Sequence, residues 1–441
     1  MAIAAAVSGQ EAPNHPRAVW MGLIAGIAHN MVIGCLMGSF SVMLASVEGR
    51  MGVTREMSSS VGALVIFGSA LIASIVGPLM ARYSLRWLMF FGGLLSVAGY
   101  LILAYTNSYA LYVGSYLLLF GPSMAIAGSV GPATLVTRWF SRNRGLALGL
   151  VHLSLVVAVM PLLCNWVLET YGAREVYLMM AVLIGVTLLP AALAIQDHPP
   201  VSEGAPNAIE RADGVALAEA VDGAIPGSDP VGEAEHELTA AGPAADEMMV
   251  GEILRSGAFW SISIAAGLVI TAIMLLTFNM IPLAESLGID RNKGAILQAT
   301  MALCGMAGSI IFGWVADRIG GARGIALLAL NMAVLLVLLV FGNLPYAGLL
   351  VVIGLLGLHG AGMVPNVSRA LAHSLGQGSF SRAFGLQSAL SVPFTAIGIW
   401  AMGASFTRTG SYTAAISGVA LVLLVAVPMA FSVRGKAFSR A

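Results

Sequence analysis

Residues 323–342 read RGIALLALNMAVLLVLLVFG, with one charged side chain in this whole run. A helix of about 20 mostly apolar residues crosses the hydrocarbon core of a bilayer. Twelve such runs occur, in two sets of six: 18–45, 59–81, 87–105, 109–136, 145–169 and 174–195, then 256–282, 293–316, 323–342, 346–370, 383–405 and 412–433. They lack the apolar/polar alternation of a β-barrel. The sequence predicts an all-α integral membrane protein with twelve transmembrane helices in two six-helix bundles.

The composition excludes an ordinary soluble domain. Of the 441 residues 58% are hydrophobic and 10% are charged, whereas soluble domains are about one-quarter charged. The 21 basic residues balance the 21 acidic ones, which argues against a nucleic-acid binder. The three cysteines stand singly in apolar runs, so we expect no disulfide framework, no metal site and no cofactor.

Acidic residues concentrate between the two sets of runs. Residues 196–254 hold 13 of the 21 acidic residues and one basic residue, Arg211. This stretch has few aromatic residues, so we expect 196–255 to be a disordered cytoplasmic linker. It is interpreted as a flexible tether, and the alternative is a regulatory or partner-binding segment.

The basic residues indicate the orientation. With both termini in the cytoplasm, six of the 21 basic residues lie outside: Arg50, Arg55, Arg174, Arg291, Lys293 and Arg408. The positive-inside rule selects this orientation in a cytoplasmic (inner) membrane. The expected parts are a tail at 1–17 without a cleaved signal peptide, bundles at 18–195 and 256–433, and a tail at 434–441.

The two sets of six resemble each other in sequence. Trp20 and Trp260 are 240 residues apart, and the stretches 77–82 and 313–318 both begin with Gly and end with Arg at an offset of 236. Arg144 and Arg382, where the fifth and eleventh runs begin, are 238 apart. A parallel duplication predicts two bundles related by a twofold axis along the membrane normal, with a substrate site between them.

The repeated stretch resembles the loop motif Gly-x-Leu-Ala-Asp-Arg-x-Gly-Arg-Arg of the major facilitator superfamily, and the resemblance covers the whole chain. The second copy keeps Gly313, Asp317, Arg318 and Gly320, whereas the first has Ala81 at the Asp position. The stretches 138–147 and 252–260 resemble the monocarboxylate / oxalate–formate porter branch. The resemblance implies a cytoplasmic gating motif at Gly77, Arg82, Arg86, Gly313, Asp317 and Arg318.

Polar side chains inside the runs are few, and no carboxylate lies deep in any of them. His29, with Asn30 beside it, and His359 lie near the middle of the first and tenth runs, which line the cavity in the resembled family. An imidazole takes up a proton or donates to an anionic oxygen. The alternative is a histidine satisfied by a neighbouring helix carbonyl.

Other polar side chains have two open interpretations. Asn279 and Asn366 bind substrate or hold helices together. Arg138, His152 and Arg369 attract an anion or take part in coupling, or the two arginines extend to the lipid headgroups.

These observations predict a monomeric secondary carrier in the lipid bilayer that works by alternating access. It moves a small, monocarboxylate-like organic anion with a proton or by exchange, that is, by symport or antiport. The alternative is an exporter of amphipathic or drug-like molecules. An intramembrane enzyme is disfavoured, because His236-Glu237 lacks the metalloprotease spacing and we identify no catalytic residue.

Overall fold

The computed structural model describes residues 16–140, 147, 150–153, 155–199, 248–376 and 379–432. The predicted tails and nearly all of the predicted linker therefore lie outside the described residues, as does most of 141–150, where the fifth run begins. Helices occupy all twelve predicted positions.

The first half contains six rods. Their segments are α2 (Ala18–His29), η1 (Asn30–Gly34), α3 (Cys35–Met51), α4 (Arg55–Arg82), α5 (Leu85–Tyr105), α6 (Tyr109–Ser115), η2 (Tyr116–Phe120), α7 (Gly121–Ser123), η3 (Met124–Val130), α8 (Gly131–Trp139), α10 (Leu155–Thr170) and α11 (Ala173–Leu193). The segments η1, η2 and η3 are π-helical and continue the first and fourth rods without a break.

A short helix precedes the six rods of the second half. The segments are α13 (Val250–Arg255), α14 (Gly257–Ser286), α15 (Arg291–Ile319), α16 (Gly321–Phe341), α17 (Tyr346–Ala361), α18 (Met363–Leu375), α19 (Phe380–Thr409) and α20 (Thr413–Phe431). Among the described residues, ten helical segments are long and apolar enough to cross a membrane. The rod α15 is bent by 41° after Gly308, and α10 is a shorter apolar helix.

Several helices extend past the apolar runs that predict them. The helix α4 begins at Arg55 rather than residue 59, because Thr54 caps its first turn by accepting a hydrogen bond from the backbone N–H of Met57. A polar first turn of this kind lies outside the hydrocarbon layer, and a hydropathy profile does not identify it as part of the helix.

The helix contacts repeat in the two halves. The third and sixth rods, α5 and α11, pack together, as do the ninth and twelfth, α16 and α20. Between the halves α4 packs against α19, and α10 packs against α15. Exchanging the halves turns one of these pairs into the other, which is the relation that a pseudo-twofold axis requires.

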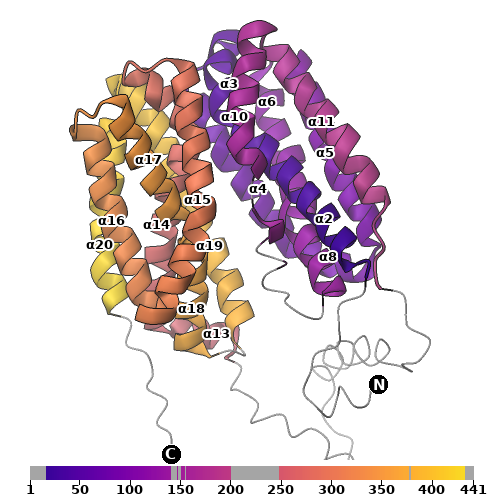
Figure 1. Ribbon diagram of the computed structural model, residues 1–441, viewed down its shortest axis with the longest axis vertical. Helices are drawn as coiled ribbons and strands as arrows, with labels where there is room; N and C mark the ends of the chain where they lie inside the picture. The colour runs from indigo at the N-terminus through magenta and orange to yellow at the C-terminus, as the bar shows by residue number, and fades with distance from the viewer. Residues whose placement is uncertain are drawn as a thin grey trace, which may run out of the picture.

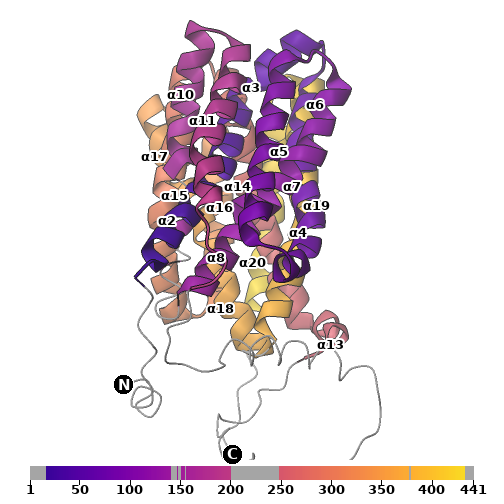
Figure 2. The ribbon, with the colours of Figure 1, turned by 90° about the vertical axis from the view of Figure 1, so that its right-hand side faces the viewer.

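Both ends of the described chain lie at one end of the rods, here called the terminal side, and the opposite end is the far side (Figure 1). The two halves meet on the far side and diverge toward the terminal side (Figure 1). Turning the view by 90° places the first half in front of the second (Figure 2). Each half buries an apolar cluster of its own, and Phe278 and Ile281 of α14 join the cluster of the first half.

Candidate functional site

Two related hydrogen bonds join the halves between the far side and the middle of the rods. The hydroxyl of Ser59 in α4 donates to Oδ1 of Asn279 in α14 at 2.8 Å. The amide of Gln298 in α15 donates to the carbonyl oxygen of Met37 in α3 at 3.2 Å. The first bond joins the second rod to the seventh, and the second joins the eighth to the first, so the pseudo-twofold exchanges them. Asn279 therefore holds the halves together in this conformation.

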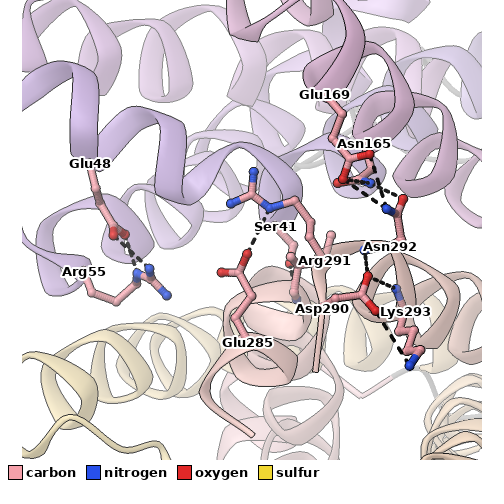
Figure 3. Close-up of polar contacts among 11 residues, drawn as sticks. Ser41, Glu48, Arg55, Asn165, Glu169, Glu285, Asp290, Arg291, Asn292 and Lys293 are labelled. Carbon is pink, nitrogen blue, oxygen red and sulfur yellow. Dashed lines mark hydrogen bonds and ion pairs between the residues drawn. The ribbon is translucent and has the colours of Figure 1, made fainter. Parts of the chain in front are cut away.

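A charged cluster closes the far side between α4 and α19 (Figure 3). Arg55 makes a two-pronged ion pair with Glu48, with Nη2 to Oε2 at 2.8 Å, and both side chains are largely buried. The Nη1 of Arg55 also donates to the hydroxyl of Tyr412 in the second half at 2.7 Å. Next to it, the indole N–H of Trp400 donates to Glu56 at 2.9 Å.

A second polar cluster closes the far side between α10 and α15 (Figure 3). The amide of Asn165 donates to Oδ1 of Asn292 at 2.6 Å, and the amide of Asn292 donates to Glu169 at 3.1 Å. The hydrogen bonds between the halves that involve only described residues all lie on this side or near mid-depth. The far side is therefore the closed side of this conformation.

His29 lies at the end of α2, directly before the π-helical segment η1. Its Nδ1 is 2.6 Å from the carbonyl oxygen of Gly128 in η3, and the ring of His152 is 4.6 Å away between centroids. A carbonyl oxygen only accepts, so Nδ1 carries the proton of the neutral ring and Nε2 is its basic nitrogen. His29 is buried, whereas His152 is exposed.

This histidine pair lies where the regular helix geometry is interrupted three times. The segments η1 and η3 are π-helical, and the helix around Val151 ends in a turn at His152 before α10 begins. Such π-bulges are frequent at functional sites. The structure thus brings together two predicted site residues that are 123 positions apart in the sequence.

The side chain of Asn30 stabilises the break in the helix before α10. Its amide donates to the carbonyl oxygens of Gly26 and Leu153 at 3.0 Å, and its Oδ1 accepts from the backbone N–H of Val156 at 3.1 Å. In this conformation the side chain satisfies the backbone groups that the break before α10 leaves open.

His359 lies inside the second half rather than beside His29. Its Nδ1 is 2.7 Å from the carbonyl oxygen of Leu355, and its Nε2 is 3.2 Å from the amide of Asn331. Both ring nitrogens of the neutral form are therefore engaged within one bundle, and the ring packs 5.0 Å from that of Phe312.

Asn366 is fully buried in the second half. Its amide donates to the carbonyl oxygens of Gly362 at 2.7 Å and Phe312 at 3.3 Å. A Cβ built on Gly324 would lie 1.6 Å from Oδ1 of Asn366, so this amide fills the contact between α16 and α18.

Arg138 and Arg369, predicted to attract anions, bind corresponding places in the two repeats. Arg369 forms an ion pair with the carboxylate of Asp317 and donates to its carbonyl oxygen at 3.3 Å. Arg138 donates to the carbonyl oxygen of Met80 at 2.6 Å, next to Ala81, which stands where the first copy of the motif lacks the Asp. Arg138 of the fourth rod thus holds the end of the second rod, and Arg369 of the tenth rod holds the end of the eighth, in this conformation.

The remaining motif residues lie on the terminal side. Gly77 belongs to α4, and Arg82 and Arg86 are exposed. The guanidinium of Arg318 stacks over the ring of Trp314 at 3.7 Å, and Gly313 faces Pro365 at 3.8 Å from a Cβ built on it.

Most residues that join the halves could not be predicted from the sequence. Ser41, Ser59, Gln298 and Tyr412 are ordinary polar residues near apolar runs, and nothing local marks them. One signal was available for Ser41, whose Oγ accepts from the backbone N–H of Ile281 at 2.8 Å. These two residues are 240 positions apart, the same offset as that between the two tryptophans of the repeat.

The comparisons with known proteins agree with this architecture. Residues 22–399 match the profile of the Major Facilitator Superfamily. The chain belongs to this family. It is similar to the uncharacterized MFS-type transporter YcxA of Bacillus subtilis (strain 168), with 22% identity over 187 residues. That match spans 42% of this chain and 46% of the relative, about half of its length.

The fold is also similar to a crystal structure of a bacterial homolog of the human lysosomal transporter Spinster in an inward-facing and unoccupied conformation. The TM-score is 0.63 at 14% identity, covering 95% of this chain and 96% of the other. The predicted fold class is therefore confirmed, and the chain is a multi-pass membrane protein of a transporter family, not of an enzyme family. Among the described residues, no three His, Cys, Asp or Glu side chains lie together as a metal site would need.

Proposed function

We propose that this transporter is a secondary carrier in a cytoplasmic membrane that moves a small organic anion together with a proton or by exchange. Its terminal side is the cytoplasmic side, so the described conformation is open to the inside and closed to the outside. The main support is the separation of two features: polar contacts between the halves gather on the far side, and the paired imidazoles of the first half lie nearer the terminal side along their rods. A carrier requires these two features, a closed gate and a site behind it.

The histidine pair couples the proton to the anion by electrostatics. Two imidazolium ions whose rings are 4.6 Å apart repel each other, so a proton on one ring disfavours a proton on the other. An anionic oxygen placed beside both rings offsets this repulsion and favours the second proton. Substrate and proton then bind more tightly together than alone, which is the condition for coupled transport.

The test is uptake into proteoliposomes. Monocarboxylates are screened by counterflow, and the pH dependence of uptake is then measured for His29→Gln, His152→Gln and the matched control His359→Gln. We expect the first two variants to flatten the pH profile and His359→Gln to retain it. A pH profile that survives both His29→Gln and His152→Gln would refute the coupling proposal.

The second candidate is an exporter of amphipathic molecules, which fits the absence of carboxylates deep in the apolar runs. The same proteoliposomes distinguish the two functions. Efflux of a lipophilic dye without counterflow of any carboxylate supports the exporter, and saturable carboxylate counterflow supports the anion carrier.

A further inference from the structure

A cavity of about 300 Å³ opens on the terminal side of the second half, between the beginning of α16 and the end of α18. Arg323, Arg369 and His373 line it together with Gly320 and Ser374, and none of the described residues that line it is acidic. The cavity lies away from the histidine pair, which belongs to the first half. It is therefore a candidate for a second site.

Two of the three basic side chains have no partner in the described part of the protein. Arg369 is paired with the exposed carboxylate of Asp317. Arg323 and His373 make no hydrogen bond or ion pair with another described residue, and both are exposed. The cavity thus presents one guanidinium and one imidazole to an incoming group, with a second guanidinium at its wall.

The backbone adds donors to the same wall. The helix α16 begins at Gly321, and Gly320 before it supplies no side-chain cap. The first N–H groups of a helix have no partner within the helix, and they carry its positive end. These amides and the basic side chains therefore attract an anion to the same place.

The internal repeat shows an anionic group at the corresponding place in the first half. The helices α5 and α16 are both 21 residues long and begin 236 positions apart, at Leu85 and Gly321. In the first half the backbone N–H of Arg86 donates to the carboxylate of Asp197 at 3.1 Å. The residue at the corresponding position in the second half is Ala322, which lines the cavity.

We propose that this cavity binds a phosphate group, carried by an anionic phospholipid of the adjoining leaflet or present as free phosphate. Guanidinium groups match phosphate oxygens in two-pronged contacts, and helix N-termini accept phosphate readily. The cavity lies at the ends of membrane-crossing helices, at the level of the headgroups, where basic pockets bind anionic lipids.

Binding is measured on the full-length protein in neutral detergent by native mass spectrometry. The probes are dioctanoyl phosphatidic acid, dioctanoyl phosphatidylcholine and inorganic phosphate. We expect phosphatidic acid to bind, and the combined variant Arg323→Gln/His373→Gln to weaken binding about tenfold or more, since it removes a charge-assisted guanidinium contact and an imidazole donor. Asp317→Asn, which releases Arg369, is expected to strengthen binding.

Arg408→Gln is the control, because Arg408 is an exposed arginine at the far-side end of the same half. Competition by inorganic phosphate identifies free phosphate as a ligand, and binding of the lipid without such competition identifies the headgroup. The proposal is wrong if neither phosphatidic acid nor inorganic phosphate binds, or if the Arg323 and His373 variants bind as the wild type does. Because both residues are exposed, the variants should fold as the wild type does, and an unchanged melting temperature verifies this.

Discussion

Ser41 and Ile281 lie 240 positions apart, the offset of the two tryptophans of the repeat, and they touch each other. The backbone N–H of Ile281 donates to the hydroxyl of Ser41 at 2.8 Å, across an offset of 240 residues. Equivalent positions of a twofold repeat meet only close to the axis that relates them. This contact therefore marks where the pseudo-twofold axis passes between the first and seventh rods.

Ser41→Ala is expected to favour opening of the far side. A neutral hydrogen bond contributes about 1 kcal/mol, so the closed population should fall about fivefold relative to the open one. Electron–electron distance measurements between spin labels at Asn107 and Arg408, in a Cys304→Ala background, report this change. Ser39→Ala is the matched control, because the hydroxyl of Ser39 faces a carbonyl of its own helix. Equal distance distributions in the Ser41 and Ser39 variants would contradict the argument.

Tyr412→Phe is expected to have a larger effect in the same direction. It removes only the contact between the halves and leaves the Glu48–Arg55 pair in place. A hydrogen bond from a charged donor contributes about 1.5–3 kcal/mol, so a shift of about tenfold or more is expected in the same distance measurement. Tyr346→Phe provides the comparison, since the hydroxyl of Tyr346 binds the carbonyl oxygen of Lys293 within one half. A closed far side in Tyr412→Phe would show that this bond does not hold the gate.

Gly357→Ala is expected to destabilise the second half. A Cβ at Gly357 would lie 2.0 Å from the carbonyl oxygen of Met301, so α15 and α17 would have to separate. Overpacking of this kind costs about 1–3 kcal/mol and lowers the melting temperature. Gly385→Ala in α19 is the control, because nothing lies within 4 Å of a Cβ there. A similar melting temperature in the two variants would mean that this close approach does not limit stability.

The arrangement of rods follows from the sequence, because a bilayer imposes a length and an apolar character on every crossing helix. The repeat was also visible, through Trp20 and Trp260 and the two loop motifs. The site was less visible, since one sequence does not say which face of an apolar helix is buried in its own bundle. His29 and His359 both lie near the middle of an apolar run. Only His29 lies beside a second imidazole, whereas His359 is engaged by Asn331.

The gate, meaning the two far-side clusters and the other hydrogen bonds between the halves, could not be predicted from the sequence for a different reason. Its bonds join serine, asparagine, glutamine and tyrosine side chains to partners more than one hundred residues away, as with Ser59 and Asn279. Polar residues of this kind at helix ends occur throughout the chain. Only the pairing of α4 with α19 and α10 with α15 brings them together, and that pairing is a property of one conformation of the carrier.

The two far-side clusters are expected to act independently on one equilibrium. Asn292→Ala removes the contacts of Asn292 with Asn165 and Glu169, on the α10–α15 side of the gate. Tyr412→Phe acts on the α4–α19 side and shares no partner with it. Since each half moves as a packed body, opening breaks both clusters at once, so the free-energy effects should add within about 0.5 kcal/mol. The measurement is a double-mutant cycle on the distance populations of Asn292→Ala, Tyr412→Phe and the combined variant. A combined effect no larger than that of one single variant would mean that the two sides open separately, which a rocking motion of two rigid bundles does not allow.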